Sequence, residues 1–155
     1  MKLTHAVKTA FTLQLHRQSG RIGITAPAPT ISRYLLGLVF LVFGLNGFLH
    51  FIPQPPMPDG LANQYMNVMV ASQYFVLVFV IQVVCAALFL SNQYVPLAPT
   101  LIAPVIVNIL LFHGLMLPTG LPIALIVTAL WFVLFYWNRA AFAGILQNRQ
   151  PGSLI

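Results

Sequence analysis

The sequence predicts an all-α integral membrane protein whose four transmembrane helices form an up-down-up-down bundle. Hydrophobic residues make up 59% of its 155 residues and charged residues only 5%, whereas a soluble domain carries about 25% charged residues. Four apolar runs are each long enough to cross the hydrocarbon core of a bilayer as a helix, which takes about 20 residues. Because the connections between these runs are short, neighbouring helices are expected to run antiparallel.

The first apolar run, residues 31–52, is the strongest of these signals. As a helix it would be about 33 Å long at 1.5 Å per residue, which matches the hydrocarbon core. Between Tyr34 and Leu49, Asn46 carries the only polar side chain. Arg33 stands at the foot of the run, where its methylenes can lie in lipid while its guanidinium reaches the headgroups. We therefore predict a transmembrane helix here.

Small residues line one face of this first helix. At 100° per residue, Gly37, Gly44 and Gly47 fall close to one line, which also includes Arg33 and Phe40. Since glycine has no side chain, a second helix can approach the backbone closely along this line. We predict that the three glycines form a helix-packing surface.

The remaining spans follow from the same reasoning about apolar runs. The predicted organisation is a basic N-terminal segment at 1–30, a membrane domain at 31–140 with spans at 31–52, 67–90, 96–117 and 121–138, and a tail at 141–155. Because the N-terminal segment contains no sustained apolar core, we expect no cleaved signal peptide and a mature chain that begins at Met1.

The charge pattern predicts the orientation. The chain has seven Lys and Arg residues and a single acidic residue, Asp59, which gives a net charge of +6. All seven basic residues fall on one side of a four-span topology, and the loops on the other side carry none. Because positive residues accumulate on the cytoplasmic side, both termini are expected to be cytoplasmic in a bacterial inner membrane. The positive charge therefore reflects topology, and no nucleic-acid partner is expected.

The residue inventory excludes several kinds of site. A single cysteine, Cys85, leaves no disulfide within the chain and no thiolate metal cluster. With Asp59 as the only acid, acid–base pairs and carboxylate proton relays are not available. The sequence also has no phosphate-binding loop and no metal-ligand spacing. It therefore contains no self-contained catalytic constellation, and whether it is an enzyme is left open.

Four polar side chains are predicted to lie at one depth. Asn46 and His50 are near the end of the first span, and Asn108 and His113 are near the end of the third. Polar groups are costly to bury in lipid unless they meet partners inside the bundle. We therefore expect a polar ligand pocket just below the outer surface, with Gln82 as a further polar point near mid-membrane.

This pocket has three alternative interpretations. In the first, the histidines lie in the wet interface and the amides tie helices together. In the second, an imidazole and a carboxamide donate hydrogen bonds to a quinone or another small-molecule headgroup. In the third, His50 and His113 ligate a haem, which only their matched depth supports. The cofactor is therefore unknown, with quinone favoured over haem and no other metal expected.

Two stretches carry a family resemblance. RYLLGLVFLVFGLNGFLHFIPQPPMP at 33–58, followed by VPLAPTLIAPVIVNILLFHG at 95–114, resembles the DoxX family of small four-helix membrane proteins. The resemblance covers about residues 31–140. It implies a role near quinone-linked redox chemistry, because the family takes its name from a subunit of a membrane thiosulfate:quinone oxidoreductase. Many relatives carry an acid near the position of Gln82 and a lysine near that of Gly47, so a charge-based mechanism is not transferred.

The pocket and the resemblance together lead to one functional expectation. We expect a non-catalytic or quinone-binding subunit of a bacterial inner-membrane redox assembly. Its partners would be the lipid bilayer and either a redox-enzyme subunit or further copies of the same chain. The alternatives are a channel or transporter for small uncharged solutes and a haem-bearing electron carrier.

Overall fold

The computed structural model describes residues 27–53 and 56–142, and every regular element within these ranges is a helix. The elements are α2 (Pro27–Leu49), α3 (Leu61–Ala71), α4 (Tyr74–Ser91), α5 (Leu97–Leu115), the 3-10 turn η1 (Pro118–Gly120), α6 (Leu121–Trp137) and α7 (Arg139–Phe142). Most of the predicted N-terminal segment and tail lie outside the described residues.

Four helical segments are long and apolar enough to cross a membrane: α2, α4, α5, and η1 together with α6. Large hydrophobic side chains lie on their outward faces. Leu77, Leu111 and Ile126, on three different helices, are 58%, 55% and 61% exposed. A protein in water rarely leaves so many apolar side chains on its surface. Length, composition and exposed surface thus indicate a multi-pass membrane protein in contact with a lipid bilayer.

The first helix is shifted relative to the predicted span. It begins at Pro27 because Pro27 and Pro29 fall in its first turn, where a missing N–H removes no helical hydrogen bond. It ends at Leu49, before the predicted end at residue 52. His50 has a φ of 51°, a left-handed conformation that commonly follows the last residue of a helix.

The second predicted span, 67–90, is divided between two helices. Its first residues belong to α3, and α4 begins only at Tyr74. Gln73 lies between them with a φ of 61°, and a left-handed residue does not continue a right-handed helix. By contrast, α5 and α6 lie within the third and fourth predicted spans.

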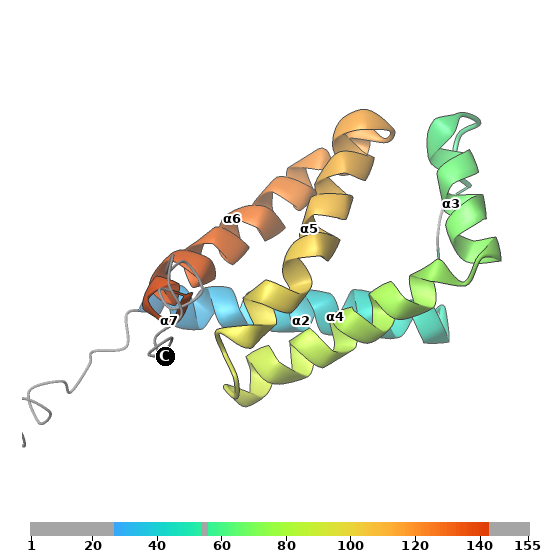
Figure 1. Cartoon of the computed structure of the whole chain (residues 1–155). Helices are drawn as coiled ribbons and strands as arrows, with labels where there is room; N and C mark the ends of the chain where they lie inside the picture. Colours follow the sequence, from blue (N-terminus) through green and yellow to red (C-terminus); the bar gives the residue numbers. More distant parts are fainter. Residues whose placement is uncertain (1–26, 54–55, 143–155) are drawn as a thin grey trace, which may run out of the picture.

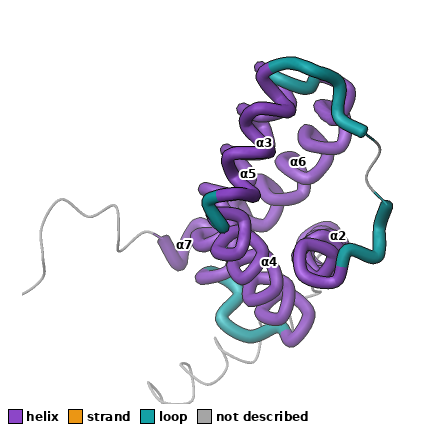
Figure 2. The backbone as a smooth tube through the Cα atoms, turned by 90° about the vertical axis from the view of Figure 1, so that its right-hand side faces the viewer, coloured by secondary structure: helices purple, strands orange, loops and turns teal. Residues whose placement is uncertain are grey.

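The four long helices form two pairs (Figures 1 and 2). α2 lies alongside α4 and α5 alongside α6, and the chain runs in opposite directions within each pair. The pairs cross at a wide angle, in contrast to the near-parallel helices of a regular bundle. They meet near the start of α2, where α2 contacts α6 and α4 contacts α5, and they diverge toward the ends of α2 and α5.

The α2–α4 pair is close because glycines line α2. A Cβ added at Gly37 would lie 2.9 Å from Cδ2 of Leu90. A Cβ at Gly44 would lie 2.9 Å from Cγ2 of Val83, and one at Gly47 would overlap a phenyl ring of α4. α4 therefore packs on the glycine face that helical periodicity defines.

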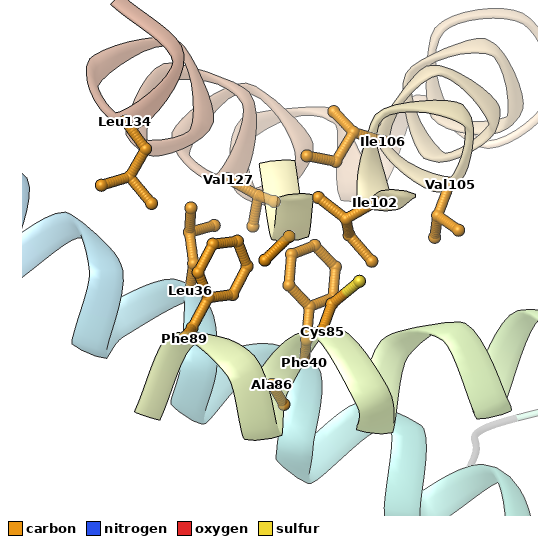
Figure 3. Packing of buried hydrophobic residues seen from close by; sticks show 11 residues of the cluster. Leu36, Phe40, Cys85, Ala86, Phe89, Ile102, Val105, Ile106, Val127 and Leu134 are labelled. Carbon is orange, nitrogen blue, oxygen red and sulfur yellow. The ribbon is translucent and has the colours of Figure 1, made fainter. Parts of the chain in front are cut away.

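A hydrophobic core fills the region where the two pairs cross (Figure 3). Phe40 of α2 and Phe89 of α4 are among the largest fully buried side chains. In Figure 3 they point, with Cys85, toward Ile102 of α5 and Val127 of α6. This cluster joins the two pairs, since it draws side chains from all four long helices.

Two polar side chains connect helices within or beside this core. Trp131 of α6 is half-buried and donates from Nε1 to the carbonyl oxygen of Pro99 in α5 at 2.8 Å. Arg33, which the sequence predicts at the headgroup end of the first span, is 8% exposed, and its guanidinium donates to the carbonyl oxygen of Phe89. The carbonyls in the last turn of a helix are available to outside donors, and that of Phe89 accepts from Arg33 as well as from the backbone N–H of Asn92 at 3.4 Å.

Candidate functional site

Asn46 and His50 form the end of α2. The backbone N–H of His50 donates to the carbonyl oxygen of Asn46 at 2.9 Å. The Asn46 side chain accepts a second hydrogen bond at Oδ1 from the N–H of Ile52, at 2.6 Å. Asn46 thus holds the chain as it leaves the helix, while the His50 side chain is exposed.

Asn108 and His113 are also engaged locally. Asn108 is exposed and exchanges hydrogen bonds with the hydroxyl of Tyr65 in α3, at 2.9 and 3.2 Å. His113, in the last turn of α5, has its Nδ1 3.1 Å from the carbonyl oxygen of Leu117. A Cβ added at Gly120 would overlap the His113 ring. This imidazole therefore packs inside the tight turn between α5 and α6.

The structure does not bring the two polar pairs into contact. The ends of α2 and α5 lie apart in both Figures 1 and 2, and the hydrogen-bond partners of the two pairs differ. A haem held from both sides requires two imidazoles that face each other across the iron. His50 and His113, at these separated helix ends, do not fit that arrangement.

Tyr65 is the polar residue near these sites that the sequence reasoning missed. Its ring lies 5.5 Å from that of Phe112, and its hydroxyl bonds to Asn108, so it connects α3 to α5. The signal that could have revealed a separate helix is the run of amides around it. Asn63, Gln64 and Asn67 make this segment too polar for a membrane span.

Gln82 is the predicted residue whose environment is most unusual. It lies near the middle of α4, is 7% exposed, and its Oε1 is the only fully buried side-chain N or O atom among the described residues that lacks a hydrogen-bond partner. Its Cβ faces Gly44 of α2, where an added Cβ would lie 3.1 Å away. A buried amide oxygen without a partner is unfavourable by roughly 1–3 kcal/mol, so a hydrogen-bond donor from a ligand would stabilise this site.

Aromatic rings lie next to Gln82 on the side toward the end of α2. Phe79, one turn before Gln82, is 5.6 Å from Phe75 and 5.9 Å from Phe48 of α2, measured between ring centres. Phe75 and Phe79 are partly exposed, and Phe48 is exposed. These phenyl rings offer stacked and edge contacts of the kind that aromatic pairs favour at such distances.

No group of three or more His, Cys, Asp or Glu side chains within residues 27–53 and 56–142 is arranged to hold a metal ion. Comparisons with protein-family models, curated proteins and solved structures gave no match to this chain. A buried carboxamide beside phenyl rings can bind and orient a ligand, but it supplies neither a nucleophile nor a general base.

Proposed function

We propose that this chain is a DoxX-like, four-span protein of a bacterial inner membrane that binds a quinone as a non-catalytic subunit of a redox assembly. The observation that carries the proposal is the unpartnered Oε1 of the buried Gln82. The resemblance of the first and third spans to the DoxX family supports the redox context.

A carboxamide suits both redox forms of a quinone. Its oxygen accepts a hydrogen bond from the hydroxyl of the reduced quinol. Turned by 180°, the same group presents Nε2 as a donor to the carbonyl of the oxidised quinone. The phenyl rings of Phe48, Phe75 and Phe79 offer the apolar contact that such a ring needs. Gln82 would thus hold the ligand without a role in electron transfer.

The proposed topology is up-down-up-down with both termini in the cytoplasm. Two observations support it. The chain direction alternates within each helix pair, and Arg33 and Arg139 belong to elements at the same end of the molecule, the start of α2 and α7. Because positive residues mark the cytoplasmic side, that end would face the cytoplasm, and the phenyl rings beside Gln82 would lie nearer the outer leaflet.

Binding of a short-chain benzoquinone and its quinol to the detergent-purified protein tests the ligand. Replacing Gln82 with Leu should weaken both affinities about threefold to tenfold, because one hydrogen bond is lost. The same variant without ligand should melt at an unchanged or higher temperature, since it removes an unsatisfied buried oxygen. The control is Gln64→Leu on the exposed face of α3, which should alter neither property.

The opposite pattern would reject the proposal. If Gln82 only ties helices together, Gln82→Leu lowers the melting temperature, and the wild type shows no saturable quinone binding. The proposed assembly has its own test, which is purification of the native protein in mild detergent. A redox-enzyme subunit should co-purify in a fixed ratio, and measurable solute flux by a chain without such a partner would favour the transporter alternative.

A further inference from the structure

Arg33 is a buried cation without an acidic partner among the described residues. It is 8% exposed, and its guanidinium contacts the carbonyl oxygen of Phe89 and lies 4.3 Å from the centre of the Tyr34 ring. Asp59 carries the only side-chain carboxylate in the whole sequence. Asp59 is exposed in the turn before α3, which lies at the opposite end of the molecule from the start of α2 (Figure 1).

The two contacts of Arg33 offset only part of its charge. The carbonyls at a helix C-terminus carry about half of a unit of negative charge. An aromatic face attracts a cation but does not neutralise it. A buried charge is unfavourable unless it is paired. The described residues provide no anion to pair with Arg33.

The remaining donors of Arg33 are not sealed inside the core. A guanidinium has five N–H donors on three nitrogens, and Nη1 is the nitrogen that donates to Phe89. No nitrogen of Arg33 is both fully buried and without a partner among the described residues, and 8% of the residue's surface is exposed. Tyr34, which stacks on the guanidinium, is itself 45% exposed.

We propose that Arg33 binds a phosphate group, carried by an anionic phospholipid headgroup or by free phosphate. The planar fork of arginine matches the oxygens of a phosphate and can donate to two of them at once. The inference rests on the membrane location of the chain, because anionic lipids are concentrated in the cytoplasmic leaflet. It does not depend on the ligand of Gln82, which lies elsewhere along α4.

The test uses the full chain in an uncharged detergent, titrated separately with phosphatidylglycerol, phosphatidylcholine and inorganic phosphate. Phosphatidylglycerol should raise the melting temperature of the wild type, and Arg33→Gln should weaken this binding about tenfold or more, as expected for lost charge-assisted hydrogen bonds. The matched control is Arg139→Gln. Arg139 is exposed and lies 4.1 Å from the Tyr136 ring centre in the same kind of arginine–tyrosine contact, and its loss should leave the affinity nearly unchanged.

The three ligands identify the source of the phosphate. Stabilisation by phosphatidylglycerol alone supports a lipid headgroup, and equal stabilisation by inorganic phosphate supports a free anion at the same site. If Arg33→Gln does not fold, Arg33→Lys keeps the charge without the fork and should bind severalfold more weakly than the wild type. Equal losses in the Arg33 and Arg139 variants, full affinity in the Arg33 variants, or no stabilisation of the wild type would overturn the proposal.

Discussion

Gly44 provides a direct test of the contact between α2 and α4. In Gly44→Ala, the new Cβ would lie 2.9 Å from Cγ2 of Val83 and 3.2 Å from the Val83 backbone nitrogen. The side chain can shift slightly but the backbone nitrogen cannot move without displacing α4. Overpacking of this kind lowers the free energy of unfolding by about 1–3 kcal/mol, and the gain in helix propensity returns about 0.5–1 kcal/mol.

Gly114→Ala is the matched control for this change. Gly114 is also helical, but a Cβ added there meets no atom within 4 Å, so only the stabilising propensity term remains. The two variants should therefore differ by about 1–3 kcal/mol, which for a chain of this size is about 2–12 °C in melting temperature. Circular dichroism of both proteins during heating in the same mild detergent measures this difference.

A second substitution separates the steric contact with Val83 from the other effects of alanine at position 44. Val83→Ala removes the side-chain atom nearest to the new Cβ. Gly44→Ala should therefore lower the melting temperature less in the Val83→Ala protein than in the wild type. If Gly44→Ala melts at or above the temperature of Gly114→Ala, the glycine face is not in contact with α4.

Three further predictions concern topology and the ties between helices. A phosphatase fused after Ile155 should be inactive and a fluorescent protein at the same place should be bright, since that end is expected in the cytoplasm; an active phosphatase would contradict the topology. Trp131→Phe should lower the free energy of unfolding by about 0.5–1.5 kcal/mol, because the carbonyl of Pro99 loses a donor, and unchanged melting would mean that this bond is not formed. Tyr65→Phe should speed hydrogen exchange in α3 but not in α4, since the hydroxyl bonds to Asn108 are lost; equal exchange in both proteins would show that these bonds do not hold α3.

The sequence was most informative about helix length and about which residues share one face of a helix. Apolar length predicted the four long helices, and the 100° rotation per residue placed Gly37 and Gly44 on the face that α4 covers. A turn at the entry of the second span was expected, but the left-handed residue at Gln73 that ends α3 was not, because the apolar pattern continues on both sides of it.

The arrangement of polar side chains depended on how the helices cross and on local backbone partners, which the number of residues along a helix does not predict. Equal counts along two helices imply equal depth only when the helices are parallel, and here the pairs cross. Asn46 and His113 each found a backbone partner a few residues away, which is the usual outcome for polar groups near helix ends. The contact of Arg33 with the Phe89 carbonyl was not predicted, because the two residues are 56 positions apart in the sequence.

The α2–α4 pairing also has a consequence for biosynthesis. A ribosome makes α2 first, yet the helix that covers its glycines appears only after the loop beyond residue 49 and all of α3 have been added. During that interval Arg33 lacks the Phe89 carbonyl, and α4 does not yet cover the glycine face of α2. The α5–α6 hairpin has no such delay, since only a short turn separates its helices. A nascent chain that stalls before α4 therefore lacks the helix that covers the glycine face of α2.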